Sequence, residues 1–328
     1  MIYKSHLDLV LDDVFVEEHT ILPHANLYMK IEGLSIGGSI KIKPALKMIS
    51  RLEIQGKLKP GSKIIESSSG NLGIALSIIC AAKGYEFNCV VDPNILPSSE
   101  RLIKSYGANI IKVTHKDENG GFLNSRIRKI RAMCQQDESL TWLNQYENID
   151  NIEAHYLTTA QSIANHFPTL DFVFVGAGTT GTLGGISHFF SRNLPHTKII
   201  AVDSVGSITF GGVSGKRKIP GLGASKEPPI SRLSSFHDII RVEEQKTLAM
   251  CHAFARKGML IGGSTGTVLS GVQQYSDQIP KGSTVVAISP DLGERYLNTI
   301  YSPQWLNEHF PDETFKPNQP LHTIIKGI

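Results

Sequence analysis

The sequence has few cysteines and no cluster of metal-binding side chains. Its 328 residues include four cysteines and twelve histidines, which are scattered along the chain. No CxxC pair occurs, so we predict neither a disulfide framework nor a metal site. The four cysteines are Cys80, Cys89, Cys134 and Cys251.

The sequence also lacks an excess of charge of one sign. It has 33 basic and 30 acidic residues, and the net charge is +3. No long run of one sign occurs, which argues against nucleic acid as a partner. Segment 1–20 carries acidic residues and no secretory apolar core, and no apolar run is long enough to cross a bilayer. We therefore expect a cytoplasmic protein with no membrane partner.

Short β-rich apolar segments alternate with amphipathic segments along most of the chain. Apolar residues make up 41% of the sequence, enough for substantial cores. This alternation predicts an α/β fold in which parallel sheets are covered by helices. We expect strands within 62–67, 86–93, 109–114, 170–176, 197–204 and 283–291, and helices at 70–85, 98–108, from about 183 and at 243–257.

The chain length has room for about two domains of ~150 residues, and the alternating strands and helices can be divided into two series. We expect a smaller domain at 47–150. The strand-like segment 26–33 is expected to pack on the second series, so the larger domain is predicted to combine 1–46 with 151–328.

A glycine-rich segment, VGAGTTGTLGG at 175–185, follows a predicted strand and opens a predicted helix. Its glycines allow a tight turn whose N–H groups point at an anion, and the helix dipole favours the same anion. The segment also satisfies GxGxxG, and Asp203 ends the next strand about 20 residues later, as a dinucleotide site requires. A terminal phosphate and a dinucleotide both remain open here. The polar and glycine positions are Gly176, Gly178, Thr179, Thr180, Gly181 and Thr182.

Two further turns combine hydroxyl or amide groups with a helix start. ESSSGNLG at 66–73 could hold a carboxylate on its N–H groups, and its alternative role is a helix cap. Ser264 lies in IGGSTGTVLSG at 261–271, where capping is again the alternative. The polar residues of the first turn are Ser67, Ser68, Ser69, Gly70 and Asn71.

Lys41 lies between two isoleucines, directly after a glycine turn. Desolvation lowers the pKa of an amine, and a neutral amine can form a Schiff base. Lysines in this position more often snorkel from a helix surface. The four features together require one ligand with a terminal phosphate, an aldehyde and ring atoms that need polar partners. Pyridoxal 5′-phosphate satisfies all three requirements, whereas a dinucleotide leaves Lys41, Asn71 and Ser264 without a role.

With these motifs in order, the chain resembles the fold-type II pyridoxal-phosphate enzymes of the cysteine synthase and cystathionine β-synthase family. Within that family it is most similar to the branch that makes 2,3-diaminopropionate, which includes N-(2-amino-2-carboxyethyl)-L-glutamate synthases of siderophore pathways. It departs from ordinary cysteine synthases at Ser35-Ile36, where they usually have Asn-Pro, and at Ile42-Lys43, where they usually have Asp-Arg. The matching motifs are GGSIK, SSSGNLG, NQY, GAGTTGT, PGLGAS, GGSTG and SPDLGERYL.

The resemblance implies two doubly wound parallel-sheet domains with the cofactor in the cleft between them, the smaller domain being mobile, and a homodimer. It makes Lys41 the catalytic, Schiff-base lysine. It implies that the cofactor is bound by Lys41, Asn71, Gly176, Gly178, Thr179, Thr180, Gly181, Thr182 and Ser264. The substrate-binding residues would be Ser67, Ser68, Ser69, Gly70, Asn71 and Gln145, with Arg126 and Tyr146 added as candidates for the leaving group or the nucleophile.

The implied reaction is a β-replacement on an activated L-serine through an aminoacrylate. The expected nucleophile is the amine of L-glutamate, giving N-(2-amino-2-carboxyethyl)-L-glutamate, a precursor of L-2,3-diaminopropionate for siderophores or peptide antibiotics. Ammonia and sulfide are alternative nucleophiles, and sulfide would make the chain a cysteine synthase. O-phospho- and O-acetyl-L-serine both remain open as donors. A dinucleotide-dependent oxidoreductase and a non-catalytic metabolite-binding module are the competing classes. The basic segment 215–218 is interpreted as either a cavity rim or a solvated loop.

Overall fold

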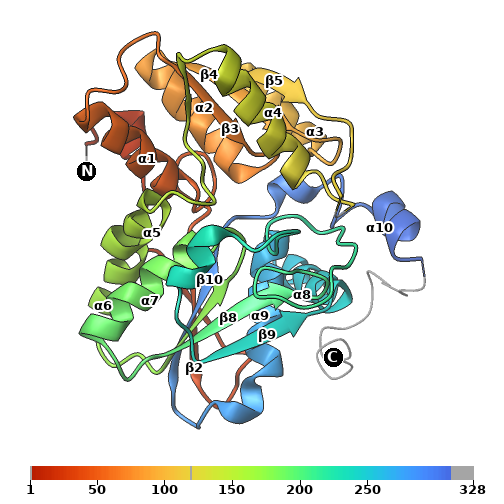
Figure 1. Ribbon diagram of the computed structural model, residues 1–328. Coiled ribbons are helices and arrows are strands. Elements are labelled where there is room, and N and C mark those ends of the chain that lie inside the picture. Colours follow the sequence, from red (N-terminus) through yellow and green to blue (C-terminus); the bar gives the residue numbers. More distant parts are fainter. Residues whose placement is uncertain (1, 119, 312–328) are drawn as a thin grey trace.

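The computed structural model describes residues 2–118 and 120–311, which form an α/β structure with two separate sheets (Figure 1). The larger sheet has the strand order β1-β2-β10-β7-β8-β9, and all neighbours are parallel except β1 and β2. The fold class predicted from sequence is therefore confirmed. The strands are β1 (Phe15–Glu18), β2 (Asn26–Ile31), β7 (Phe172–Gly176), β8 (Lys198–Ser204), β9 (Asp238–Val242) and β10 (Thr284–Ser289).

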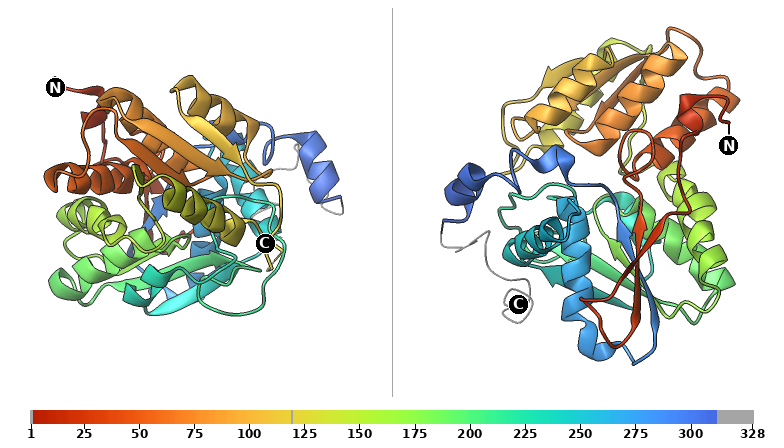
Figure 2. Two further views of the ribbon diagram at one scale, coloured as in Figure 1. Left: turned by 45° about the horizontal axis from the view of Figure 1, so that its top comes forward. Right: turned by 180° about the vertical axis from the view of Figure 1, so that it is seen from behind.

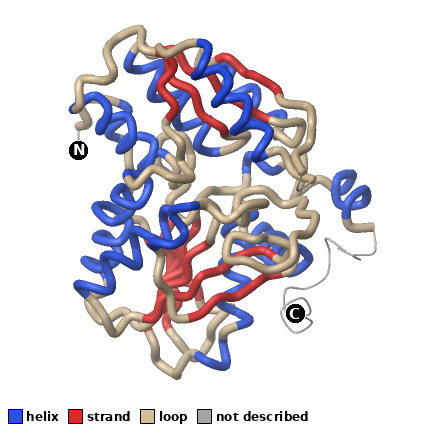
Figure 3. The backbone as a smooth tube through the Cα atoms, viewed as in Figure 1, coloured by secondary structure: helices blue, strands red, loops and turns tan. Residues whose placement is uncertain are grey.

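The smaller sheet has the order β5-β4-β3-β6 and is parallel throughout. Figure 3 shows the two sheets in separate halves of the molecule, with loops where the halves meet. The strands are β3 (Lys63–Ser67), β4 (Glu86–Val91), β5 (Asn109–Lys112) and β6 (Leu140–Trp142).

Helices surround both sheets (Figures 1 and 2). One of them is continuous from Asp150 to His166 but contains a π-helical turn, η2 (Tyr156–Ala160). The α-helices are α1 (Ile42–Ile54), α2 (Asn71–Lys83), α3 (Pro97–Ser105), α4 (Leu123–Gln136), α5 (Asp150–His155), α6 (Gln161–His166), α7 (Gly181–Asn193), α8 (Glu244–Arg256), α9 (Gly263–Gln274) and α10 (Pro303–His309); short 3₁₀ turns are η1 (His6–Asp8), η3 (Pro229–Leu233), η4 (Ser276–Gln278) and η5 (Glu294–Tyr296).

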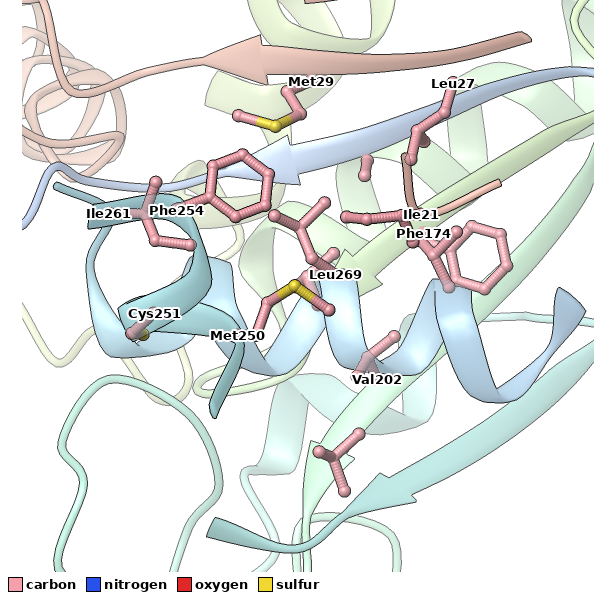
Figure 4. Close-up of a cluster of buried hydrophobic side chains, with 14 of the residues drawn as sticks. Ile21, Leu27, Met29, Phe174, Val202, Met250, Cys251, Phe254, Ile261 and Leu269 are labelled. Carbon is pink, nitrogen blue, oxygen red and sulfur yellow. The ribbon is translucent and has the colours of Figure 1, made fainter. Parts of the chain in front are cut away.

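The larger sheet is buried on both faces, as its apolar strands predict. Successive side chains of a strand point to opposite faces. Phe174 of β7 accordingly packs in one core cluster with Val202 and Leu269, whereas Val173 and Val175 pack in another. Figure 4 shows the first cluster, in which strands β7, β8 and β2 meet helices α8 and α9. Helices α6 and α7 supply side chains to the second cluster.

The N-terminal strand β2 pairs in parallel with β10 of the larger sheet, although more than 250 residues separate them in the chain. Figure 2 shows β1 and β2 in red beside β10 in blue. The domain boundaries themselves stay a prediction. The boundary expected at 47 falls inside α1, whose residues from Ile42 to Ile49 pack with the core of the smaller sheet.

The elements expected from sequence are present, but the structure has further ones. Strands β1, β6 and β9 were not predicted, nor were helices α4, α5, α6 and α10. The strands β6 and β9 lie in short segments of mixed polarity. Helix α7 begins at Gly181, about two residues earlier than expected, because Thr180 takes a left-handed conformation that ends the turn. In the described part of the chain, no helix is long and apolar enough to span a membrane. Residues 312–328, the end of the predicted larger domain, lie outside the described residues.

Candidate active site

A cavity of about 340 Å³ lies where the carboxyl ends of strands from both sheets come together. Such ends are the usual ligand sites of parallel sheets. Segment 67–71 follows β3, Asp92 follows β4, Gln145 and Tyr146 follow β6, and Gly178 and Thr179 follow β7. The cavity therefore gathers segments that are more than 100 residues apart in sequence. Its other lining residues include Lys41, Arg126, Arg217, Gly221, Gly223, Arg295 and Tyr296.

Lys41 is the residue before α1 and reaches this cavity. Gly37 and Gly38, which precede Lys41, have φ of 79° and 64°. Glycine adopts this left-handed conformation without strain, which is why two glycines stand here. The amide of Ile40 then donates to Pro290 O at 2.8 Å, which fastens the segment to the end of β10. Lys41 forms no ion pair within the described residues, and burial lowers its pKa from 10.5 to about 8. A substantial fraction of this amine is therefore neutral near physiological pH.

The serine-rich turn joins β3 to α2. Ser68 Oγ accepts hydrogen bonds from the amides of Gly70 and Gly73, at 3.4 and 3.0 Å, so Ser68 caps the helix. Ser67 Oγ is buried and has no partner in the described chain. Gln145 Nε2 donates to Ser67 O at 2.9 Å and holds the turn from the β6 side. The turn thus combines a capping serine with donors that are free to bind a ligand.

A buried carboxylate, Asp291, joins two of the predicted site residues. Asn71 Nδ2 donates to Asp291 Oδ2 at 2.7 Å, and Ser264 Oγ donates to Asp291 Oδ1 at 3.2 Å. The Tyr296 hydroxyl donates to Oδ2 at 2.5 Å, and Arg295 Nη1 donates to Asn71 Oδ1 at 2.5 Å. Burial raises the pKa of Asp291 above 3.8. Asp291 lies within SPDLGERYL, but nothing in that segment marks it as a site residue, because its partners Asn71 and Ser264 are far away in sequence.

The turn between β7 and α7 forms a cradle of free amide groups. Thr180 has φ of 69°, a conformation that non-glycine residues rarely adopt. The amides of Gly178, Thr179 and Thr180 donate to no acceptor among the described residues. The first amides of α7 also lack intrahelical partners, as at every helix start. This arrangement fits a phosphate group.

Close packing explains the glycines of this turn. A Cβ atom on Gly181 would lie 2.1 Å from Asn151 Oδ1, and one on Gly176 would lie 2.7 Å from Leu222 Cδ2. A Cβ atom on Gly178 would lie 3.3 Å from Gly221 O. The backbone at Gly181 and Gly176 is therefore packed so closely against its neighbours that it has no room for a side chain.

The three threonine hydroxyls of this turn have different partners. Thr179 Oγ1 accepts from Asn151 Nδ2 at 3.1 Å. Thr180 Oγ1 donates to Thr179 O at 2.6 Å and so faces its own backbone. Thr182 Oγ1 lies 3.2 Å from His155 Nε2. Asn151 and His155 were missed in the sequence, since nothing in their local segment marks them as neighbours of the glycine turn.

Three arginines line the cavity. The side chain of Arg126 is 12% exposed, so it is not a solvated surface charge. Its Nη1 donates to Ser69 Oγ at 3.1 Å, and its Nε lies 3.4 Å from Asp92 Oδ2. Arg217 Nη1 donates to Leu222 O at 2.9 Å, but its buried Nε has no partner in the described chain. Tyr146 lies in the same wall, and burial raises the pKa of its phenol.

The basic segment 215–218 fits both interpretations in part, a cavity rim and a solvated loop: Arg217 belongs to the cavity wall, whereas Lys216 and Lys218 are exposed.

Asp203 is the residue whose position after β8 agreed with a dinucleotide site. It is fully buried and accepts from the amide of Ser204 at 2.8 Å. Asp203 does not line the cavity.

The structure thus brings Lys41, the serine-rich turn, Arg126, Gln145, Tyr146, Gly178 and Thr179 into one cavity wall. Gly176, Thr180, Gly181, Thr182 and Ser264 lie outside the lining, although Ser264 packs within 3.3 Å of a Cβ atom placed on Gly221, which does line it. Within the described residues, a partly buried lysine with no counter-ion, a cradle of free amides and a hydroxyl beside Asp291 fit an aldehyde that carries a phosphate and a ring nitrogen.

Comparisons with known proteins agree with this fit. Residues 16–291 match the family model described as "Pyridoxal-phosphate dependent enzyme". The chain is 38% identical over 310 residues to the N-(2-amino-2-carboxyethyl)-L-glutamate synthase of Ralstonia nicotianae, covering 93% of this chain and 92% of the relative.

Two solved structures extend the likeness to the fold. The crystal structure of O-ureido-L-serine synthase has a TM-score of 0.85 and 27% identity, covering 96% of this chain and 98% of that one. The crystal structure of the O-acetylserine-dependent cystathionine β-synthase from Helicobacter pylori also has a TM-score of 0.85, with 26% identity, covering 92% of this chain and 100% of that one.

Proposed function

Because the chain belongs to the family of pyridoxal-phosphate-dependent enzymes, with the fold-type II architecture, we propose that it is a β-replacement synthase that joins L-glutamate to the three-carbon unit of an activated L-serine. The product is N-(2-amino-2-carboxyethyl)-L-glutamate. The similarity over nearly the full length to a synthase of that name supports this choice of product. The observation that carries the chemistry is the position of Lys41, partly buried and without a counter-ion among the described residues, in the same wall as the serine-rich turn and the glycine turn.

In this function the cofactor, when bound, supplies an electron sink for the negative charge that develops at the substrate α-carbon. The amides of the glycine turn would hold its phosphate, and Ser264 would be the partner of its ring nitrogen. Lys41 would attach the resting cofactor, and its amine would take the proton from the substrate α-carbon and later return it. Its lowered pKa suits both tasks, because an amine must be neutral to act as a base.

The serine-rich turn binds the α-carboxylate of the serine substrate. Ser67 Oγ lacks a partner among the described residues, and the turn lies at the start of α2, where the helix dipole favours an anion. Gln145 keeps the turn in place through a hydrogen bond to Ser67 O.

The proposal also includes the domain organisation and the assembly. Residues 47–150 form the smaller, mobile domain that carries the serine-rich turn, and two chains form a homodimer.

The cavity wall favours an anionic amine over sulfide as the nucleophile. Sulfide is small and needs no binding group, whereas glutamate has two carboxylates that need donors in a closed site. Arg126 and Arg217 both lie in the wall, and no described residue accepts a hydrogen bond from the buried Nε of Arg217. A guanidinium binds a carboxylate or a phosphate with two parallel hydrogen bonds. The same arginines suit a phosphate leaving group, so O-phospho-L-serine is the donor to test first, beside O-acetyl-L-serine.

The test is a competition between nucleophiles. The holoenzyme is incubated with O-phospho- or O-acetyl-L-serine and with glutamate, ammonia or sulfide, and products are identified by mass spectrometry. We expect N-(2-amino-2-carboxyethyl)-L-glutamate at the highest kcat/KM. Preferential formation of cysteine from sulfide would make the chain a cysteine synthase and contradict the proposal. Arg217→Met should raise KM for glutamate and leave KM for ammonia unchanged, and Lys218→Met, at an exposed neighbouring position, is the matched control.

A further inference from the structure

A row of buried polar side chains lies behind the glycine turn and ends at Thr182. Lys43 Nζ is 3.0 Å from Thr159 Oγ1, Thr159 Oγ1 is 3.0 Å from His155 Nδ1, and His155 Nε2 is 3.2 Å from Thr182 Oγ1. All four residues are buried. The family resemblance assigns cofactor binding to Thr182 but no role to Lys43, Thr159 or His155, and the proposed function has not used these three residues.

Lys43 sets the one direction of hydrogen bonding in which every hydrogen of the row has a described acceptor or faces the helix start. An ammonium group has three N–H donors and no acceptor. Lys43 donates to Asp12 Oδ1 at 2.5 Å, to Glu32 Oε1 at 2.8 Å and to Thr159 Oγ1. Thr159 therefore accepts from Lys43. Donation of its single hydroxyl hydrogen to His155 Nδ1 uses the other partner within reach, whereas an Nδ1–H on His155 would leave that hydrogen without an acceptor among the described residues.

The same reasoning fixes the tautomer of His155. A neutral imidazole carries one hydrogen, on one of its two nitrogens. Burial, followed by the charges of Lys43, Lys41 and Lys30, lowers the pKa of His155 well below 6.5, so the ring is neutral. Nδ1 accepts from Thr159, and the hydrogen therefore sits on Nε2. Nε2 donates to Thr182 Oγ1.

The hydroxyl hydrogen of Thr182 is left at the end of this row. Within residues 2–118 and 120–311, no acceptor takes it. Thr182 is the second residue of α7, next to the amides of the glycine turn that have no protein acceptor. A dianionic phosphate at this helix start is the natural acceptor for a hydroxyl hydrogen that is already oriented.

We propose that Lys43, Thr159 and His155 form a one-way hydrogen-bond relay that turns the hydroxyl hydrogen of Thr182 toward the cofactor phosphate. His155 is a positioning residue, held as the Nε2–H tautomer. The inference rests on the family's cofactor and is independent of which nucleophile the enzyme uses.

The backbone is shaped for this relay. His155 and Thr159 are four residues apart, and the π-helical turn η2 begins directly after His155. Such turns often occur at functional sites, where they change the direction of side chains. Gly185 allows α7 to approach, because a Cβ atom there would lie 2.6 Å from His155 Cβ. Without this close approach, the imidazole ring would not reach Thr182.

The relay also links the two parts of the cofactor site. Lys43 lies two residues after Lys41, at the start of the same helix α1. Its charge is balanced in a buried cluster in which Lys30 and Lys43 face Asp12 and Glu32. The cluster has two positive and two negative groups, so what reaches the phosphate is an oriented row of donors and not a net charge.

The first test reads the tautomer directly. The holoenzyme is labelled with ¹⁵N-histidine, and long-range ¹H–¹⁵N correlation spectra are recorded, with His155 identified by its absence in His155→Gln. We expect the Nε2–H tautomer in the native protein and a change of tautomer population in Thr159→Val. An Nδ1–H tautomer in the native holoenzyme would overturn the proposal.

The second test separates the phosphate from the rest of the cofactor. Thr182→Val should release pyridoxal phosphate from the holoenzyme roughly tenfold faster, because a hydrogen bond to a charged group is lost. Thr182→Ser should restore the native rate. The same variants reconstituted with pyridoxal, which has no phosphate, should not differ from the native protein. An equal effect of Thr182→Val on both cofactor forms would refute a phosphate-directed role.

A neighbouring threonine provides the matched control for Thr159→Val. Thr158 Oγ1 donates to Ala154 O at 2.7 Å and takes no part in the row. Thr158→Val should change neither the His155 tautomer nor cofactor release, whereas Thr159→Val should shift the tautomer and speed release severalfold. Circular dichroism and the melting temperature show whether both variants are folded. Identical behaviour of the two variants would contradict the relay.

Discussion

The pKa of Lys41 gives the most direct physical test of the site. Burial lowers it from 10.5 to about 8, and no carboxylate within the described residues offsets the loss of hydration. At pH 7 an amine with a pKa of 8 is neutral about 300 times more often than one with a pKa of 10.5. Attachment of the cofactor to the apoprotein should therefore speed up through pH 8 and not through pH 10.

The same shift has a consequence for stability. Between pH 8 and 10.5 the unfolded chain binds the Lys41 proton more than the folded chain does. The contribution of Lys41 to the free energy of unfolding therefore rises with pH through that window. Below pH 8 the burial of the charged amine destabilises the folded state by its full amount. A shift of this size corresponds to about 3 kcal/mol. Lys41→Met should thus raise the stability of the cofactor-free protein at pH 7 by up to about 3 kcal/mol, while abolishing turnover.

The assay is an NMR titration of cofactor-free protein labelled with ¹³Cε-lysine. The Lys41 signal is assigned as the one missing in Lys41→Met, and exposed lysines such as Lys216 serve as internal controls. We expect a midpoint near pH 8 for Lys41. A midpoint at or above pH 10, or a Lys41→Met variant no more stable than the native protein in urea at pH 7, would refute the reasoning from burial.

The remaining predictions concern the phosphate cradle, a second buried acid and assembly. Replacement of Gly178 by leucine should weaken cofactor binding, because a Cβ atom there already lies 3.3 Å from Gly221 O; cofactor retained after dialysis is the measurement, and full retention would remove this turn from the site. Burial raises the pKa of Glu66 from 4.5 to about 7. The folded state then binds the extra proton between these values, so the free energy of unfolding falls as pH rises through that window. Glu66→Gln should remove this slope and raise stability at pH 8 by up to about 3 kcal/mol in urea denaturation, whereas an unchanged slope would mean that Glu66 titrates normally. Sedimentation at working concentration should give a homodimer, and a monomer would contradict that proposal.

The local features of the site could be predicted from the sequence because they depend on neighbouring residues. Gly37 and Gly38 adopt positive φ directly before Lys41, as a glycine turn requires. The strand-to-helix turns after β3 and β7 follow from apolar strands, glycines and helix starts, all of which lie within a dozen residues. Ser68 turned out to be a cap, the alternative that the sequence had left open for this turn.

The partners of these residues could not be predicted, because each contact joins segments far apart in the chain. Asp291 meets Asn71 across 220 positions, and Glu66 accepts from the amide of Gln145 across 79. Nothing in the segment around Arg217 distinguishes it from the exposed lysines beside it until the chain folds over the cavity.

The sequence by itself therefore determined the alternation of strands and helices, the glycine turns and the lysine that follows one of them. Only the tertiary structure decided that Lys41 has no counter-ion in the described part of the chain, while Lys43, two residues later, has two carboxylates. The reason is physical. Backbone conformation responds to nearby residues in the chain, whereas the pKa and hydrogen-bonding direction of a buried side chain depend on dehydration and on groups brought to it by folding.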